Sequence, residues 1–440
     1  MNKGIYIATS EPNSGKSIVA LGLMKMLLSK TPKVGYFRPI IDYNANGNRD
    51  NHINTILTHF DLKVDYEECY AFTRPEFLNK LNSDKDGEII DTIIEKYKTL
   101  EEQNDFMLVE GTDFSGEGVS IELDLNVYIA KNLGLPTVIV TSGIGKNLQE
   151  FINAMHLAYD SYDEKGVKVS AVIANKVQEE NIDTIVSEVT TKVAKDVVVN
   201  AIPLVSNLKN PSVKEISKAI DAKVLFGEDL LNSQSSSFKV GAMQLENYLN
   251  YLEQDCLIIT PGDRSDIILG ALQANISSNY PKISGIVLTG GLVPEPSITK
   301  LIEGLKYLVP ILSVEQGTFE VANKIGNMRT HMYADNEEKI LLALSTFEKH
   351  CETEKLSEKL VNFKHDGVTP RMFQYNLLKR AKRQRKHIVL PEGEDDRIIT
   401  AAARLSLMDF VDLTLLGQEE KIKESVVRLG LKMNFENINI

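Results

Sequence analysis

Near its N-terminus the chain reads Ser10-Glu11-Pro12-Asn13-Ser14-Gly15-Lys16-Ser17, between a strand-like run at Gly4–Thr9 and a helical pattern at Ser17–Ser29. This spacing matches a phosphate-binding P-loop, except that Ser10 replaces the leading glycine. In such a loop, backbone N–H groups and the helix N-terminus face the phosphates. Lys16 neutralises the phosphate oxygens and the Ser17 hydroxyl ligates Mg²⁺. The stretch therefore predicts a nucleotide site at Ser14, Gly15, Lys16 and Ser17, and the alternative is a tight turn that binds nothing.

The pattern around this loop continues over about the first 220 residues. Short apolar runs alternate with amphipathic helical stretches, and the runs lie at Val34–Arg38, Asp105–Glu110, Pro136–Thr141 and Val169–Asn175. Such alternation is typical of a parallel sheet with helices on both faces. We expect an α/β domain over residues 1–214.

Composition excludes several classes of protein. The 440 residues are 43% hydrophobic and 25% charged, as in a folded chain, and the net charge of −12 disfavours nucleic acid and anionic membranes as partners. Cys69, Cys256 and Cys351 lie far apart, which argues against a zinc site or a disulfide framework. No window has the ~18 apolar residues of a membrane span, and no signal peptide is recognisable. We expect a cytoplasmic protein.

A second α/β unit is predicted over residues 215–334. The Ser-rich stretch Asn232–Ser237 reads as a linker or exposed loop, and strands are expected at Cys256–Thr260, Ile283–Thr289 and Val309–Ser313. Two strands end in Thr260-Pro261-Gly262-Asp263-Arg264 and Leu288-Thr289-Gly290-Gly291. Glycine-rich strand ends beside an arginine indicate an anion pocket. The alternative is a clasp between Asp263 and Arg264 that only holds the fold.

A third pattern begins near Arg371, after a segment at 335–370 that reads as helical and then linker-like. It comprises a basic helix to Arg385, a strand at His387–Leu390, a helix from Arg397 and a strand at Val411–Leu415. The basic run is either a solvated helix face or a site for phosphate groups. Two strands bury little apolar surface, so we expect 371–440 to be an incomplete α/β domain, ordered poorly or by packing on its neighbours.

Several segments of the first domain resemble dethiobiotin synthetase and its cobyric-acid relatives. The resemblance covers roughly residues 1–210 and rests on the phosphate loop, Gly35–Ile40, Leu108–Gly111, Ala174–Lys176 and Ile202–Pro203. It implies that Glu110 helps Ser17 to hold Mg²⁺ and that Asn175 contacts adenine of ATP. Without the resemblance, both residues could equally be polar ends of strands. Arg38 stands where these ligases carry a substrate-binding lysine, and arginine does not replace that lysine chemically.

The second unit resembles the DRTGG domain, which is named for the two motifs quoted above. The resemblance covers about residues 215–330. It implies a regulatory or oligomerisation role. The residues expected to carry regulation are Asp263, Arg264, Thr289, Gly290 and Gly291.

The third pattern resembles the opening of the phosphate acetyl/butyryltransferase catalytic domain. The resemblance rests on Thr369–Phe373 and on His387–Arg397, which includes Val-Leu-Pro-Glu-Gly. The order of the three domains is typical of the long, multidomain phosphate acetyltransferases of acetate metabolism. The resemblance implies reversible acetyl transfer between acetyl-CoA and orthophosphate, with a carboxylate base, arginine and serine groups that lie later in the domain. We therefore expect a truncated chain whose 440 residues alone are inactive, and we name no catalytic residue.

The sequence thus predicts four segments: 1–214, a P-loop domain; 215–334, a DRTGG domain; 335–370, a linker; and 371–440, the start of an acyltransferase domain. The expected ligands are ATP with Mg²⁺ in the first domain, and acetyl-CoA and phosphate as substrates. We expect a homo-oligomer. Two alternatives remain open: an ATP-dependent ligase of the dethiobiotin or cobyric acid type, and a non-catalytic module that senses nucleotides or metabolites.

Overall fold

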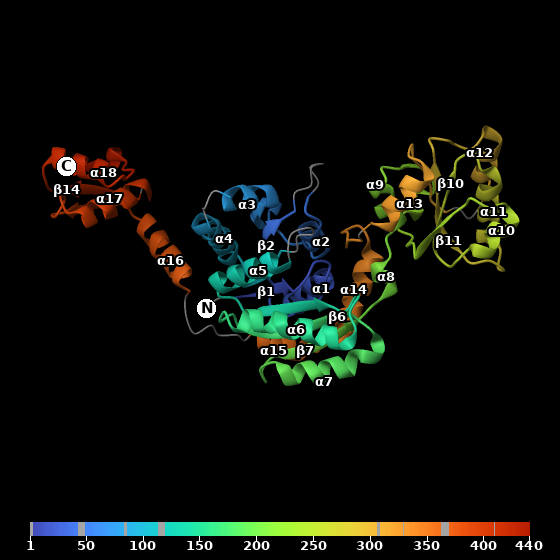
Figure 1. Cartoon of the computed structure of the whole chain (residues 1–440), viewed down its shortest axis with the longest axis horizontal. Coiled ribbons are helices and arrows are strands. Elements are labelled where there is room, and N and C mark those ends of the chain that lie inside the picture. The colour runs from blue at the N-terminus through green and yellow to red at the C-terminus, as the bar shows by residue number, and fades with distance from the viewer. Residues whose placement is uncertain are drawn as a thin grey trace.

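The computed structural model describes residues 3–42, 49–82, 86–112, 119–305, 309–328, 330–361, 369–408 and 410–440, with only the backbone of Asp86 and residues 119–122. They form three units (Figure 1). The N-terminal unit lies in the middle of the picture, with the second unit on its right and the third, red, on its left. Residues 362–368, near the end of the expected linker, lie outside the described residues.

The first unit is built on a parallel sheet of seven strands, in the order β3-β2-β4-β1-β5-β6-β7. Their bounds are β1 Gly4–Thr9, β2 Val34–Ile41, β3 Tyr70–Thr73, β4 Phe106–Glu110, β5 Thr137–Ser142, β6 Val169–Val177 and β7 Val198–Pro203. Most of these strands are buried along their whole length, as strands covered on both faces should be. The predicted parallel α/β sheet is confirmed, and it places the ends of β1, β2 and β4 side by side.

Two apolar clusters lie on the two faces of this sheet. One face carries α3 Arg74–Leu81, α4 Asp86–Glu101, α5 Val119–Leu133, α6 Leu148–Asp163 and α7 Ile182–Lys192. The other carries α1 Lys16–Leu28 and α2 Asn51–His59, together with α14 Glu337–His350 and α15 Thr353–Val361. The sequential helices thus cover both faces, and two helices from much later in the chain complete the second face.

The segment expected to be a linker, 335–370, therefore differs from that expectation over its first part. Phe347 of α14 is fully buried against α1, and a Cβ placed on Gly22 would lie 2.1 Å from its ring. Leu356 and Leu360 of α15 are buried in the same cluster. Amphipathic helices with such buried faces are part of a domain core rather than a connector, because removing them would expose this apolar surface.

The second unit has a sheet in the order β8-β12-β11-β10-β9, with β8 antiparallel to its neighbour. Its elements are α9 Val213–Ala219, β8 Lys223–Phe226, β9 Ser237–Val240, α10 Leu245–Tyr248, β10 Cys256–Pro261, α11 Ser265–Ile276, β11 Ile283–Thr289, α12 Pro296–Glu303, β12 Ile311–Ser313 and α13 Thr318–Gly326. The short helix α8 Ser206–Lys209 precedes it. The Ser-rich stretch is a loop inside this unit, not a linker before it, because Ser237 begins β9 and Ser235 is buried.

The third unit has a parallel sheet, β13-β14-β15, with its own apolar cluster. Its elements are β13 Lys386–Leu390, α17 Asp396–Met408, β14 Val411–Leu415, α18 Glu419–Arg428 and β15 Ile438–Asn439. The pattern in the sequence missed β15, which has only two residues. Ile388 and Val389 of the edge strand β13 are 38% and 53% exposed, so this sheet leaves apolar side chains uncovered.

Helix α16, Pro370–Lys382, joins the third unit to the first. Met372 is buried in the cluster around α4 and α5, whereas Leu378 and Ala381 pack against the third unit. Arg371 pairs with Asp91 at 3.1 Å, and Lys379 pairs with Glu102. Part of the basic run therefore faces acidic residues of the first unit rather than solvent.

Candidate functional site

The phosphate loop, residues Ser10–Ser17, connects β1 to α1 as the sequence predicts. Its path requires left-handed backbone at Asn13 (φ 59°) and Gly15 (φ 79°). A Cβ on Gly15 would lie 2.5 Å from Asn175 Nδ2, so only glycine fits there. The side chain of Ser10 points to β5, where its hydroxyl lies 3.2 Å from Thr141 Oγ1. Serine can thus replace the usual leading glycine, because its side chain points away from the interior of the loop.

The ends of β5 and β6 hold the phosphate loop in place. Asn175 Nδ2 donates to the carbonyls of Ser14 (2.8 Å) and Gly15 (3.2 Å). Lys176 Nζ donates to the carbonyl of Asn13 at 2.7 Å. In this state Asn175 fixes the loop, and its amide nitrogen is occupied by two carbonyls. The expected contact of the Asn175 amide nitrogen with adenine requires these two hydrogen bonds to break.

Glu11 ties the start of the loop to β5. Its carboxylate accepts from Ser142 N at 3.0 Å and from Lys146 Nζ at 2.6 Å. With Asn175 and Lys176, these bonds make the loop a rigid element rather than a free turn.

Lys16 is 1% exposed and does not extend into solvent. Its Nζ donates to the carbonyl of Gly111 at 2.5 Å and lies 3.6 Å from Glu110 Oε1. A buried ammonium is costly unless it is paired and hydrogen-bonded. The Gly111 carbonyl and the Glu110 carboxylate thus stabilise the positive charge of Lys16, which the phosphates of a nucleotide would otherwise stabilise.

Glu110 is the centre of the buried charges. His52 Nδ1 lies 2.7 Å and Arg38 Nε 3.7 Å from its Oε1 atom, and the Tyr36 hydroxyl donates to Oε2 at 2.5 Å. Burial alone would raise the pKa of Glu110, but His52, Arg38 and Lys16 together hold that pKa well below its usual range. Burial beside this carboxylate raises the pKa of Tyr36. Glu110 is therefore an anion and Tyr36 a neutral donor.

A second carboxylate balances the cations. Arg38 Nη1 donates to Asp50 Oδ2 at 2.6 Å, and both side chains are nearly buried. Burial by itself would raise the pKa of Asp50, but Arg38 and His52 lower that pKa below its ordinary value. Asp50 is also the N-cap of α2, because its Oδ1 accepts from Ile53 N at 3.0 Å. The arginine at the ligases' lysine position is therefore already paired.

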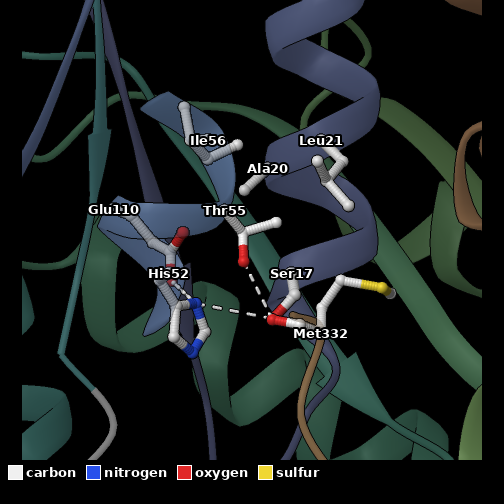
Figure 2. A pocket seen from close by; sticks show the side chains of 8 residues that line it. All are labelled: Ser17, Ala20, Leu21, His52, Thr55, Ile56, Glu110 and Met332. Carbon is white, nitrogen blue, oxygen red and sulfur yellow. Dashed lines mark hydrogen bonds and ion pairs between the residues drawn. The ribbon is translucent and has the colours of Figure 1, made fainter. Parts of the chain in front are cut away.

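Ser17, His52 and Glu110 converge on one small cavity, as Figure 2 shows. His52 Nδ1 lies 3.4 Å from Ser17 Oγ, and the cavity of ≈ 10 Å³ has room for about one water-sized occupant. Mg²⁺ in nucleotide sites takes one or two protein ligands, with phosphates and waters as the rest. Ser17 and Glu110 fit that set. His52 Nδ1 contacts oxygen atoms of the same two residues, so a cation at this position competes with the imidazole for them.

The loop also has features that fit phosphate groups. Ser14 Oγ is fully buried and has no hydrogen-bond partner among the described residues. Among the same residues no cluster of three or more His, Cys, Asp or Glu side chains is arranged as a metal site. The phosphate loop thus fits a nucleotide that brings its own cation better than it fits a free metal ion.

The sequence identified Ser14–Ser17, Glu110 and Asn175, and the structure brings all of them together. It missed Tyr36, Asp50, His52 and the carbonyl of Gly111. Gly111 and Tyr36 had a signal, because they lie in the quoted segments Leu108–Gly111 and Gly35–Ile40. Nothing in the spacing of His52 marked it as part of a site.

The second predicted site has a different construction. The guanidinium of Arg264 donates to both carboxylate oxygens of Asp266 at 2.8–2.9 Å and to the carbonyl of Met243 at 2.8 Å. The structure thus contains a clasp like the alternative reading of the sequence, but its acid is Asp266 rather than Asp263. The side chain of Arg264 is 29% exposed.

The glycine pair of the second site lies on the neighbouring strand end. Gly290 N donates to the carbonyl of Gln316 and Gly291 N to that of Val314, each at 2.9 Å. The Thr289 hydroxyl contacts Thr318 Oγ1 at 2.7 Å. These amides are used within the fold, and the contacts of Arg264 lead toward Met243 rather than toward Gly290 and Gly291. An anion pocket at these residues remains a prediction.

Among the described helices, none is both long and apolar enough to cross a membrane.

Comparison with known proteins gives three family matches in one order. Residues 3–212 match an AAA domain, 215–328 the DRTGG domain, and 372–440 the phosphate acetyl/butaryl transferase domain. A solved structure of the CBS and DRTGG domains of the regulatory region of Clostridium perfringens pyrophosphatase is 16% identical and covers 43% of this chain and 82% of its own, with a TM-score of 0.23. That score is too low to support an inference.

Relatives named phosphate acetyltransferase match almost the whole chain. The protein from Nitratidesulfovibrio vulgaris is 40% identical over 99% of this chain, and that from Synechocystis is 38% identical over 97%. The chain spans 62% and 61% of the lengths of these two relatives. In the order of its three domains and along almost its whole length, the chain is similar to these phosphate acetyltransferases.

Proposed function

We propose that this chain is part of a phosphate acetyltransferase, an enzyme that transfers acetyl reversibly between acetyl-CoA and orthophosphate to give acetyl phosphate and CoA. The observation that carries the proposal is the 40% identity to a protein of that name over 99% of the chain. In the proposed reaction a base takes the proton of the CoA thiol, and the thiolate attacks the acetyl carbonyl of acetyl phosphate and expels phosphate. We assign none of these roles to residues 371–440.

Two assays test this proposal together. The protein encoded by the native gene, with acetyl phosphate and CoA, should form acetyl-CoA, which is followed through thioester absorbance in the ultraviolet. A polypeptide of residues 1–440 should show no turnover, because a base, phosphate-binding groups and an oxyanion donor must converge on one cleft. Absence of turnover in the native protein would overturn the function. Robust turnover of 1–440 would overturn our placement of the active site.

For the first unit we propose binding of ATP with Mg²⁺ at Ser14, Gly15, Lys16 and Ser17, with Glu110 as the second cation ligand. The support is the buried, unpartnered Ser14 hydroxyl in the phosphate loop and the cavity lined by Ser17 and Glu110. Bound Mg²⁺ supplies positive charge to the phosphate oxygens. The residues of this chain position the ligand: Lys16 turns from the Gly111 carbonyl to the phosphates, and Asn175 releases the loop carbonyls to contact adenine.

Calorimetry with ATP, Mg²⁺ and residues 1–440 tests this second proposal independently of acetyl transfer. Heat of binding that requires Mg²⁺ supports it, whereas no heat with ATP or GTP favours a loop that is only a turn. No observation favours the ligase alternative, since Arg38 is paired with Asp50.

The remaining expectations concern the whole protein. We propose a cytoplasmic homo-oligomer that does not act on nucleic acid. Residues Asp263, Arg264, Thr289, Gly290 and Gly291 are proposed as its regulatory pocket. Light scattering of the native protein gives its mass in solution, and a monomer would contradict the oligomer.

A further inference from the structure

The second unit is inserted into the first through two crossings of the chain. The chain leaves the first unit at residues 210–212 and returns at 330–336, just before α14. Lys339 of α14, 1% exposed, reaches both crossings: its Nζ donates to the carbonyl of Asn210 at 3.1 Å and to that of His331 at 3.4 Å. A buried ammonium at the junction holds the two crossings together.

Glu215 of α9 completes this junction from the side of the second unit. Its carboxylate accepts from Ser212 N at 2.8 Å and from His331 N at 3.0 Å, and Lys339 Nζ lies 3.6 Å away. Glu215 is 6% exposed. Buried ion pairs contribute little net stability, but their exacting geometry can specify one arrangement over others. We call Glu215, Lys339 and the two crossings the hinge clasp.

The hinge clasp also contacts the first unit through helix α2. The carbonyl of Met332, next to His331, accepts from Asn51 Nδ2 at 2.5 Å and from Thr55 Oγ1 at 2.9 Å. Met332 also lines the small cavity beside Ser17 (Figure 2). One residue of the returning crossing thus lies against both α2 and the cation position.

Helix α2 depends on Glu110 for its own position at the phosphate loop. His52 on α2 lies 2.7 Å from Glu110 Oε1. The N-cap Asp50 is held by Arg38, whose Nε lies 3.7 Å from the same Oε1 atom. Both attachments of α2 at this end therefore change when Glu110 takes another partner.

We propose that the phosphate-loop site and the DRTGG unit are coupled through α2, so that a nucleotide with its cation changes the state of the hinge clasp. A cation on Ser17 and Glu110 displaces His52 from Glu110 Oε1. The hydrogen bonds from α2 to the Met332 carbonyl then change. The adjoining His331, whose N–H donates to Glu215, transmits this change to Glu215. This inference rests on the proposed nucleotide binding. Coupling is reciprocal, so a ligand of the DRTGG unit also changes nucleotide affinity.

Hydrogen exchange of the whole chain tests the coupling without an activity assay. Backbone amides of 212–219 and 330–336 are followed with and without saturating ATP and Mg²⁺, and saturation is checked by calorimetry. We expect their exchange rates to change by about fivefold or more, the lower end of typical allosteric coupling. ATP with a chelator, and Mg²⁺ alone, should give smaller changes because His52 then keeps its partner.

A matched pair of variants tests the route. Asn51→Ala removes one of the two hydrogen bonds to Met332, and we expect it to lose much of the exchange response at saturating ligand. Asn54→Ala changes the same residue type on the same helix, and its side chain has no hydrogen bond among the described residues. We expect it to keep the response. Glu215→Gln, which weakens the clasp on the other side, should also reduce the response.

The outcomes separate the inference from the function on which it rests. ATP binding without a change in exchange at 212–219 and 330–336 overturns the coupling and leaves nucleotide binding intact. Equal responses of Asn51→Ala and Asn54→Ala overturn the route through α2. Absence of ATP binding in calorimetry overturns both proposals.

Discussion

Two predicted sites with glycines at the ends of parallel strands differ in construction. The phosphate loop after β1 is surrounded by Lys16, Arg38 and Glu110, which are 1%, 4% and 0% exposed. The loops after β10 and β11 have Arg264, which is 29% exposed and pairs with Asp266 two residues away. The first loop concentrates charge in the interior, whereas the second keeps it at the surface.

This difference shows what a glycine-rich motif leaves open. Buried charges interact strongly and must each be balanced, so the first loop is tightly linked to several elements. An exposed pair between neighbours is screened by water and depends on one local turn. The first site should therefore respond strongly to changes of charge, and the second weakly.

The largest expected effect is the loss of Glu110. Glu110→Ala leaves buried cations without their anion and should destabilise the first unit by about 3–5 kcal/mol. Asp266→Ala, its surface counterpart, should cost about 1 kcal/mol or less. Denaturant unfolding followed by circular dichroism measures both, since the chain has no tryptophan. Similar losses in the two variants would contradict the comparison.

Acid should destabilise the first unit through the same cluster. The pKa of Glu110 lies below its ordinary 4.5 and that of Asp50 below 3.8, despite burial, because Arg38 and His52 stabilise the anions. As the pH falls, these two carboxylates therefore bind protons in the unfolded chain before they do so in the folded chain. The stability from these groups is present above about pH 4.5 and is lost as pH falls through the folded pKa values. Unfolding midpoints at several pH values should fall more steeply for the unchanged chain than for Glu110→Gln, and parallel curves would refute this.

Removal of Lys16 should weaken nucleotide binding. A hydrogen bond to a charged group contributes about 1.5–3 kcal/mol, so Lys16→Ala should reduce ATP affinity by roughly 10- to 100-fold in calorimetry. Lys25→Ala is the matched control, because Lys25 is on the same helix but pairs at the surface with Glu348. Equal affinities of the two variants would show that Lys16 does not reach the phosphates.

The smallest expected effect is that of Arg264 on stability. Arg264→Ala should change the free energy of unfolding by about 1 kcal/mol or less, because its ion pair is partly exposed. If the second unit is regulatory, the same variant in the native protein should change the response to effectors more than basal turnover. Retained effector responses with lost turnover would count against a regulatory role.

Much of the fold follows from local patterns. The strands Gly4–Thr9, Ile283–Thr289 and Val411–Leu415 have the bounds expected from their apolar runs. Strands β3, β7, β8, β9 and β15 were missed. Strands β3, β8 and β9 have four residues each and are mostly half-buried, and β15 has two residues, so these four have no distinctive pattern. The helices α14 and α15 were recognised as helical, but their place against α1 depends on contacts with residues some 300 positions away.

The sequence by itself determined the phosphate loop, the alternation of strands and helices, and the resemblance to the phosphate acetyltransferases, because these depend on neighbouring residues with regular spacing. The tertiary structure alone decided which charges meet. Tyr36 and Arg38 on β2 and Glu110 on β4 lie beside the loop after β1, because the strand order places β2, β4 and β1 together. His52 and Met332 join them from two further segments. Buried charges require partners wherever the chain can supply them, and only the packed sheet determines which distant residues those are.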